Sequence, residues 1–145
     1  MDQKSLIDKL IAEARSYVGV KWRHRGRSRF GIDCIGLVVK STAAAGIEMR
    51  DRLDYSRTPW NDGLLRELEA HFGEAVPLDE LQPGDIVAMI GEGQPEAGHV
   101  GVIAEHAGRL SLIHSYNTSA NSVVCEHSID DYWRSRFVAA FRPIK

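Results

Sequence analysis

A cysteine directly after an aspartate, in Gly31-Ile32-Asp33-Cys34-Ile35-Gly36, is the feature of the chain that most suggests chemistry. The apolar residues that follow predict a helix beginning at Cys34, with Asp33 as its N-cap. Unpaired backbone N–H groups and the positive end of the helix dipole stabilise an anion at such a position. The pattern favours an acidic, nucleophilic thiol at Cys34, and a small buried apolar cysteine is the alternative.

A nucleophilic thiol needs a general base, and the base needs an orienting group. Two of the histidines lie on consecutive predicted strands, since His99 begins one strand and His114 ends the next. If these strands form a hairpin across the turn at Ala107-Gly108, His99 and His114 are cross-strand neighbours or close to it. Two imidazoles facing a helix that begins with Cys34 make the arrangement of a thiol hydrolase.

The other histidines suggest less chemistry. His71 near a helix end, His106 in the hairpin turn and His127 after the fourth predicted strand are all expected to be solvated. Zinc bound by the cysteine and the two histidines of the proposed hydrolase site is an alternative. The short-spaced ligand pair that marks most zinc sites is missing, so we expect neither a metal nor another cofactor.

The elements that position these residues divide the chain into a helical half and a strand half. Apolar residues at three- and four-residue spacing predict three helices, which end at Gly19, Gly46 and Gly73. The third is expected to be capped at Asn61-Asp62-Gly63, after a charged surface loop over residues 48–59. Short apolar runs predict five strands, near residues 85–90, 99–104, 110–115, 122–125 and 137–141. Helices followed by an antiparallel meander indicate an α+β fold.

Length and composition fit a single globular domain over residues 1–145. With 43% hydrophobic residues, 26% charged residues and a formal net charge of −2, the chain resembles neither a disordered protein nor an electrostatic nucleic-acid binder. Its two cysteines, Cys34 and Cys125, make no disulfide scaffold. Because charges interrupt the amphipathic N-terminus, we expect no signal peptide and no membrane span, and therefore synthesis in the cytoplasm.

A run of basic residues precedes the cysteine. It consists of Lys21, Arg23, Arg25, Arg27 and Arg29. These charges could attract substrate carboxylates and lower the pKa of the thiol, and a solvated loop that balances acidic residues elsewhere is the alternative. Nucleic-acid binding is disfavoured because Trp22 is the one interleaved aromatic residue and the net charge is negative.

Several motifs in this order carry a family resemblance. Asp33-Cys34-Ile35-Gly36-Leu37-Val38 resembles the Asp-Cys-Ser-Gly-Leu-Val signature of the NlpC-type cysteine peptidases, papain-like bacterial cell-wall hydrolases. Residues 20–27, Pro83-Gly84-Asp85, Gly98-His99-Val100-Gly101-Val102 and Leu112-Ile113-His114 are similar to further segments of that family. The resemblance implies a papain-like fold, with the helix that begins at the cysteine packed on the five-stranded sheet.

The resemblance also implies roles for individual residues. Cys34 would attack a peptide carbonyl, His99 would act as general base and then acid, and His114 would hold His99 in the working tautomer. The N–H of Cys34 would help to stabilise the oxyanion. The family's substrate is a peptidoglycan stem peptide, typically cut between D-γ-glutamate and diaminopimelate, and Asp33 would bind the free amine of the stem's first residue.

Two positions depart from the family pattern, and both are expected to contact substrate. Ile35 stands where the family usually has serine, and Trp22 stands where it has a tyrosine. An indole has an N–H donor but lacks the phenolic hydroxyl, so the preference for substrate is expected to differ.

Two segments resemble the family members encoded with phage tail genes, namely residues 23–28 and Trp133 to Pro143. With the expected absence of a signal peptide, they imply a phage or prophage tail-associated peptidase, with tail-tip proteins as partners and the cell wall as its place of action. Another thiol enzyme on this fold, such as an amidase or acyltransferase, is an alternative. A structural tail protein with a relict or peptide-binding site is a third hypothesis, which Ile35 and Trp22 keep open.

Overall fold

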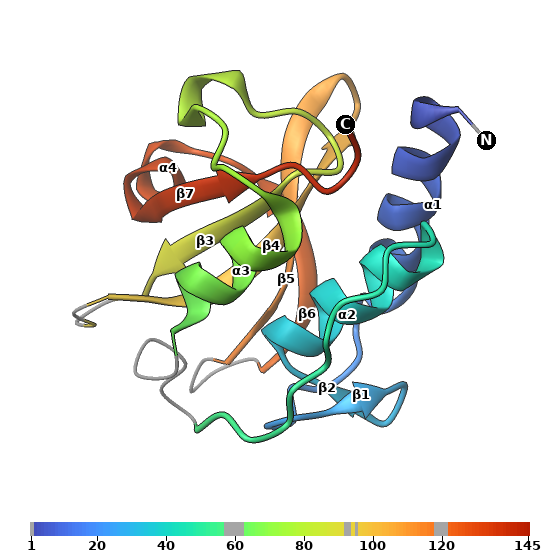
Figure 1. Cartoon of the computed structure of the whole chain (residues 1–145), viewed down its shortest axis with the longest axis vertical. Coiled ribbons are helices and arrows are strands. Elements are labelled where there is room, and N and C mark those ends of the chain that lie inside the picture. The colour runs from blue at the N-terminus through green and yellow to red at the C-terminus, as the bar shows by residue number, and fades with distance from the viewer. Residues whose placement is uncertain (1, 57–62, 92–93, 95, 118–121) are drawn as a thin grey trace.

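Helices cover both faces of an antiparallel sheet in this protein (Figure 1). The structure is a computed structural model and describes residues 2–56, 63–91, 94, 96–117 and 122–145. Its helical elements are α1 (Gln3–Ser16), α2 (Cys34–Ala44), α3 (Leu64–Phe72), the 3₁₀ turn η2 (Leu78–Glu80) and α4 (Asp131–Arg136). Within the described part of the chain, no helix is both long enough and apolar enough to cross a membrane.

Five strands form the main sheet, which confirms the predicted fold class. They are β3 (Ile86–Ile90), β4 (Ala97–His106), β5 (Arg109–Tyr116), β6 (Val123–Ser128) and β7 (Phe137–Phe141). The order β6-β5-β4-β3-β7 departs from the expected meander at one strand. After β6 the chain passes through α4, which sequence periodicity did not predict, and β7 then pairs antiparallel with β3, so that the edge of β3 is covered.

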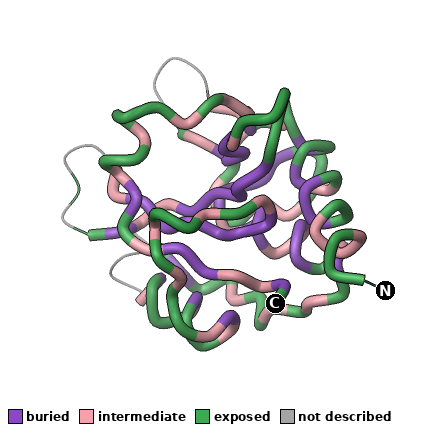
Figure 2. Tube along the Cα trace, turned by 90° about the horizontal axis from the view of Figure 1, so that it is seen from above, coloured by how far each residue is buried: buried purple, intermediate pink, exposed green. Residues whose placement is uncertain are grey.

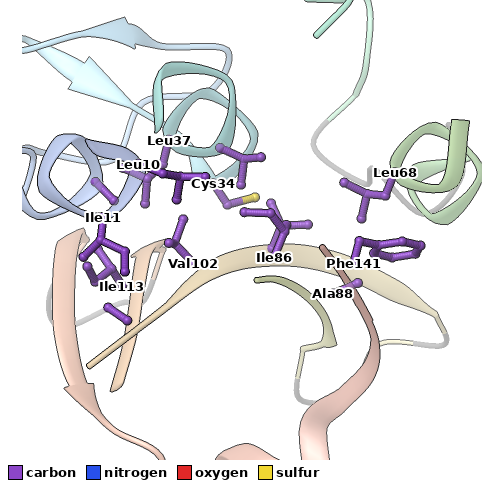
Figure 3. Packing of buried hydrophobic residues seen from close by; sticks show 14 of the residues in the cluster. Leu10, Ile11, Cys34, Leu37, Leu68, Ile86, Ala88, Val102, Ile113 and Phe141 are labelled. Carbon is purple, nitrogen blue, oxygen red and sulfur yellow. The ribbon is translucent and has the colours of Figure 1, made fainter. Parts of the chain in front are cut away.

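The apolar residues of the sheet alternate between two buried clusters. Ile86, Val102 and Ile113 face α1 and α2 in the larger cluster, which Figure 3 shows from close by. Residues next to them in sequence, such as Val87 and Leu112, form the smaller cluster on the opposite face, with Trp133 of α4 packed against it. Figure 2 shows buried segments in the middle of the molecule, with exposed residues on the loops and on parts of the helices. Both faces of the sheet are therefore buried, and polar side chains that point into either cluster need hydrogen-bond partners within the protein.

Glycine ends the predicted helices close to where the sequence places them. Gly46 and Gly73 have φ angles of 81° and 85°, a conformation that favours glycine at a helix C-terminus. The first helix ends earlier than predicted, because Tyr17 is already its C-cap and Gly19, with φ of 94°, lies in the turn beyond. Asn61 and Asp62 lie outside the described residues.

The segment that enters α2 is a small hairpin, β1 (Arg27–Ser28) with β2 (Gly31–Ile32), which the sequence analysis did not predict. Ser115 Oγ donates a hydrogen bond of 2.7 Å to the carbonyl of Ile32. This contact joins the strand that carries His114 to the residue before Asp33. The hairpin thus holds the start of α2 against the sheet.

Candidate active site

Cys34 is the first residue of α2, as predicted, and Asp33 is the N-cap. A carboxylate oxygen of Asp33 accepts a hydrogen bond of 2.8 Å from the N–H of Gly36. The Cys34 side chain lies between α2 and the sheet (Figure 3), and the residue is only 8% exposed. The backbone N–H of Val100 lies near enough to the sulfur to favour its charged form and lower its pKa. Cys34 therefore lies beside the strand that carries His99.

The electrostatics of the thiol differ from expectation. Burial, and then the negative charge of Asp33, raise the pKa of Cys34 to about 12, although hydrogen bonds to the sulfur from the backbone N–H groups of Val100, Ile35 and Cys34 itself lower it. The prediction that the basic run lowers the pKa of this thiol is wrong. At rest the group is a neutral thiol, and it needs a base to become a nucleophile.

His99 and His114 meet as predicted. His99 Nε2 and His114 Nδ1 lie 2.7 Å apart, a hydrogen-bond distance. His99 lies beside the bulge that shifts the β3–β4 register between Met89 and Ile90. Bulges near active sites often redirect a side chain. Gly101 keeps this arrangement open, because a Cβ there would lie 3.1 Å from the Cβ of His114.

Burial keeps both of these histidines neutral. It lowers the pKa of His99 to about 4 and that of His114 to about 2, and for His114 the neighbouring imidazoles lower the pKa further. His114 is fully buried, with none of its surface exposed. Near neutral pH His99 is therefore unprotonated, which is the state that a general base requires.

His127 is half-buried and hydrogen-bonded, which corrects the expectation that its side chain is solvated. Its Nε2 lies 2.8 Å from Nε2 of His114, and its Nδ1 lies 2.8 Å from the carbonyl oxygen of Ser128. The error came from ending the fourth strand at Cys125, whereas β6 continues to Ser128. Cys125 pairs with His114 across the strands, so the residue two positions later points to the same face. That alternation is the signal that could have identified His127.

Aromatic rings enclose the histidines. The ring of Trp133 lies 5.0 Å from that of His114 and 4.8 Å from that of His127, measured between centroids. Tyr116 stacks on His114 at 5.2 Å and lies 5.6 Å from His99. The short helix α4 therefore contributes directly to the surroundings of the imidazoles.

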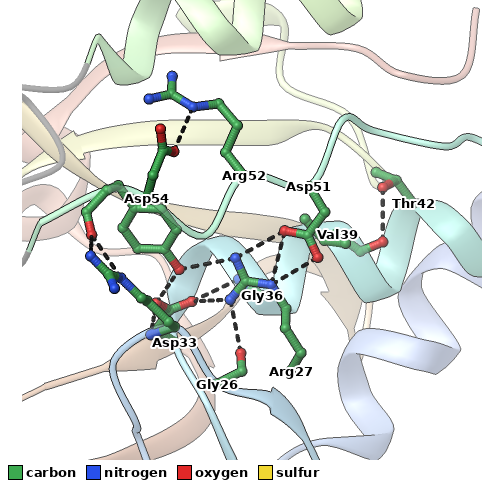
Figure 4. A network of polar contacts seen from close by, with 11 residues as sticks. Gly26, Arg27, Asp33, Gly36, Val39, Thr42, Asp51, Arg52 and Asp54 are labelled. Carbon is green, nitrogen blue, oxygen red and sulfur yellow. Dashed lines mark hydrogen bonds and ion pairs between the residues drawn. The ribbon is translucent and has the colours of Figure 1, made fainter.

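Two residues of the basic run form ion pairs with acidic side chains of the protein, and Figure 4 shows one of them, Arg27, at the start of α2. Arg27 donates to Asp33 at 3.0 Å and also pairs with Asp51 at 3.1 Å. Arg29 pairs with Glu13 at 3.0 Å. These ion pairs hold the segment before the cysteine in place, and they consume charge that was expected to be available to substrate.

Tyr55 is a site residue that the sequence analysis missed. It lies in the stretch expected to be a surface loop, but it is buried, and its hydroxyl donates to the second oxygen of Asp33. The N–H of Arg25 donates to that same oxygen at 2.7 Å. With Arg27 and Gly36 on the first oxygen, the Asp33 carboxylate accepts four hydrogen bonds. Pro59 and its neighbours in that stretch lie outside the described residues.

Cys34 and His99 line one pocket of about 170 Å³. Trp22, Asp33 and Ile35 also line it, as do residues that the sequence analysis did not single out, including His24, Tyr55 and Tyr116. The Trp22 ring stacks on His24, with the centroids 6.4 Å apart. The three residues expected to contact substrate thus surround the candidate nucleophile and base. Because the Asp33 oxygens already have four donors, an amine would bind there only by replacing one of them.

Comparison with known proteins identifies the family. The NlpC/P60 family matches residues 19–142. The chain belongs to the NlpC/P60 family. It is 33% identical over 145 residues to a probable endopeptidase NlpC of Escherichia coli K12, a match that covers 97% of this chain and 80% of that relative. Membership of the NlpC/P60 family implies cysteine peptidase activity, for which a cysteine beside a histidine is the required pair.

Solved NlpC/P60 structures share the fold. A family protein from Bacillus cereus is 21% identical with a TM-score of 0.69, and the match covers 96% of this chain but only 40% of that one. The peptidoglycan hydrolase RipB of Mycobacterium tuberculosis is 20% identical with a TM-score of 0.65, over 99% of this chain and 67% of that one. This chain thus spans two fifths of the first structure and two thirds of the second, and both confirm the papain-like NlpC/P60 fold.

One group of side chains in this NlpC/P60 domain could hold a metal ion. His114, Cys125 and His127 offer ligand atoms within 4.8 Å of one another. It is the group found among the described residues, and it contains neither Cys34 nor His99. It therefore differs from the zinc site considered in the sequence analysis, which would use Cys34, His99 and His114. Two imidazoles and a thiolate are ligand types that zinc accepts.

Proposed function

We propose that this NlpC/P60 domain is a cysteine endopeptidase that hydrolyses the stem peptides of peptidoglycan. One observation carries the proposal: Cys34 at a helix N-terminus and His99, hydrogen-bonded to His114 at 2.7 Å, line the same pocket. The names of the relatives support the substrate class, since one is a probable endopeptidase and another a peptidoglycan hydrolase.

In the proposed reaction, His99 takes the proton of the Cys34 thiol as the sulfur attacks the scissile carbonyl carbon. The negative charge moves to the carbonyl oxygen, where the N–H of Cys34 at the first turn of α2 stabilises it. The C–N bond then breaks, the amine leaves with the proton from His99, and a thioester remains. Water, deprotonated by His99, hydrolyses the thioester and restores the thiol. His114 keeps His99 oriented throughout.

The bond we propose lies between D-γ-glutamate and diaminopimelate, the usual site of cleavage in this family. Trp22 and Ile35 line the pocket and are proposed to contact the stem peptide. We propose Asp33 first as the cap and charge partner that positions α2. Its additional role as the partner of the stem's free amine is tested by Asp33→Asn, which should raise KM for a free-amine peptide more than for its acetylated form if the amine binds there.

The test of the function uses synthetic stem peptides and purified peptidoglycan, with products identified by mass spectrometry. Wild type and Cys125→Ser should release the same new fragments, and Cys34→Ala should release none. Cys125→Ser is the matched control because Cys125 is the second cysteine of the chain and lies outside the pocket. Cleavage by Cys34→Ala would contradict the nucleophile. Release of whole stem peptides from the glycan would favour an amidase and contradict the endopeptidase.

We further propose that the protein works in a phage or prophage tail, with tail-tip proteins as partners. The proposal rests on the resemblance of residues 23–28 and of Trp133 to Pro143 to tail-encoded members of the family. Mass spectrometry of purified phage particles, or of tails from an induced culture of the source bacterium, should detect the chain. Its absence from particles whose other tail proteins are detected would contradict this setting.

A further inference from the structure

Three imidazoles form an unbroken chain from the pocket towards the protein surface. His99 Nε2 meets His114 Nδ1 at 2.7 Å, His114 Nε2 meets His127 Nε2 at 2.8 Å, and His127 Nδ1 meets the carbonyl of Ser128 at 2.8 Å. The mechanism above uses the first two residues only. His127 thus has a geometric connection to the base and no assigned role.

The last contact of the chain fixes every proton in it. A carbonyl oxygen only accepts hydrogen bonds, so neutral His127 must carry its proton on Nδ1 and present a bare Nε2. His114 must then donate from Nε2 and accept at Nδ1, which requires His99 to donate from Nε2. The remaining nitrogen of His99, Nδ1, is left bare. A bare nitrogen is what a general base needs, because the opposite tautomer could not accept a proton there.

We propose that His127, anchored by the Ser128 carbonyl, is a positioning residue that sets the tautomer of His114 and thereby leaves His99 Nδ1 free to take the thiol proton. The inference rests on the proposed function, because it concerns the same base. It extends the Cys-His-His arrangement by a residue that touches neither the substrate nor Cys34. His127 acts through His114, over two hydrogen bonds.

The same chain lets positive charge leave the buried part of the site. When His99 Nδ1 accepts the Cys34 proton, the Nε2 proton of His99 can pass to His114, whose own Nε2 proton passes to His127. One proton enters, two shift along existing hydrogen bonds, and the imidazolium ends on His127, which is half-buried, rather than on fully buried His114. Trp133, centred 4.8 Å from the His127 ring, contributes an aromatic neighbour to that cation.

The distances favour this chain over a metal site. Two nitrogens bound to one tetrahedral zinc ion lie about 3.3 Å apart, given Zn–N bonds of about 2.0–2.1 Å. The two Nε2 atoms of His114 and His127 lie 2.8 Å apart, the length of a hydrogen bond. A metal at His114, Cys125 and His127 would therefore have to push these two rings apart and break the hydrogen bond between them.

Kinetics of two variants test the proposal. His127→Phe keeps a flat ring against Trp133 but removes the acceptor for His114, and His127→Gln restores an acceptor at the same distance along the side chain. We expect His127→Phe to lower kcat about 10- to 100-fold with KM within about twofold, as for other residues that orient a functional imidazole. His127→Gln should stay within about threefold of wild type. Equal loss in both variants, or a loss confined to KM, would overturn the proposal.

A spectroscopic measurement tests it without any activity. In the Cys34→Ala background, ¹⁵N chemical shifts of the imidazoles distinguish a bare from a protonated ring nitrogen. His99 should have a bare Nδ1 with His127 present, and this tautomer should be lost in His127→Phe, or in His127→Leu if the phenylalanine variant does not fold. An unchanged His99 tautomer would overturn the proposal even if peptidase activity is found. Loss of the tautomer would support it even if the substrate is different.

The metal alternative is one more outcome. Added EDTA should leave the kcat of wild type unchanged, and added Zn²⁺ should not be needed for it. The contrary result is that EDTA abolishes the activity of wild type and Zn²⁺ restores it, while Zn²⁺ restores no activity in His127→Gln or Cys125→Ser. In that case His114, Cys125 and His127 hold a metal, and the tautomer chain is wrong.

Discussion

His114 is buried without a charge, so acid should destabilise the fold by protonating this side chain in the unfolded chain. Burial and the two neighbouring imidazoles lower its pKa to about 2, against 6.5 for an ordinary histidine. At pH values between these two pKa values, His114 is protonated in the unfolded chain but not in the folded chain. The free energy of unfolding therefore falls as the pH drops below about 6.5, at up to about 1.4 kcal/mol per pH unit, and it stops falling only near the folded pKa.

The size of the effect follows from these two pKa values. At pH 5.0 the unfolded state gains about 2 kcal/mol from protonating this residue, while the folded state gains almost nothing. The assay is urea denaturation, followed by tryptophan fluorescence at pH 7.5 and pH 5.0. Wild type should lose about 2 kcal/mol more between these pH values than His114→Gln, in which the amide fills the site but does not titrate. His99, whose pKa burial also lowers, remains in both proteins, so its contribution largely cancels in the difference.

The difference between wild type and His114→Gln shows whether His114 stays neutral in the folded protein. If wild type and His114→Gln lose the same stability between pH 7.5 and pH 5.0, His114 takes up its proton in the folded state. The buried, neutral chain of imidazoles would then be wrong. A variant that is less stable than wild type at both pH values but has a flatter pH dependence is the expected result.

Three further substitutions test other parts of the site. Tyr55→Phe removes a buried hydroxyl that donates to Asp33, and it should lower the free energy of unfolding by about 1–2 kcal/mol in urea denaturation; an unchanged value would mean that the hydroxyl is not used. Gly101→Ala places a Cβ 3.1 Å from that of His114, so it should lower the free energy of unfolding by about 1–3 kcal/mol in the same assay. It should also lower kcat, and an unchanged kcat would mean that the position of His114 is not disturbed. Gly36→Ala would bring a Cβ within 2.3 Å of a backbone carbonyl oxygen, so circular dichroism should find little folded protein, and a native spectrum would contradict the packing.

Local sequence signals predicted the fold class and the centre of the site. Apolar spacing gave the three main helices, and the turn at Ala107-Gly108 does connect β4 to β5. The N-cap at Asp33 is also where the sequence placed it, because capping depends on residues only a few positions apart. The prediction that His99 and His114 lie close together was right because a hairpin register follows from its turn.

Features that depend on distant parts of the chain could not be predicted in this way. Nothing near Tyr55 in sequence shows that Asp33 is its partner, so the local pattern predicts only a surface loop there. The charges of Arg27 and Arg29 looked available until their acidic partners were located on other segments. A strand that ends at Cys125, as the apolar pattern predicts, leaves out His127, which lies on the same face as His114. In each case the environment of the side chain depends on residues that are distant in sequence, which a local pattern does not show.

The residues of the site come from both halves of the chain, so catalysis requires that both halves have folded together. Cys34 lies in the first quarter of the sequence, whereas His99, His114 and His127 belong to strands that are synthesised later. The halves meet through contacts such as the bridge between Lys21 and Val123. A growing chain therefore carries its thiol long before it has a base to activate it. The proposed peptidase activity therefore requires that the strands carrying the histidines have joined the sheet, and turnover can serve as a sensitive measure of complete folding.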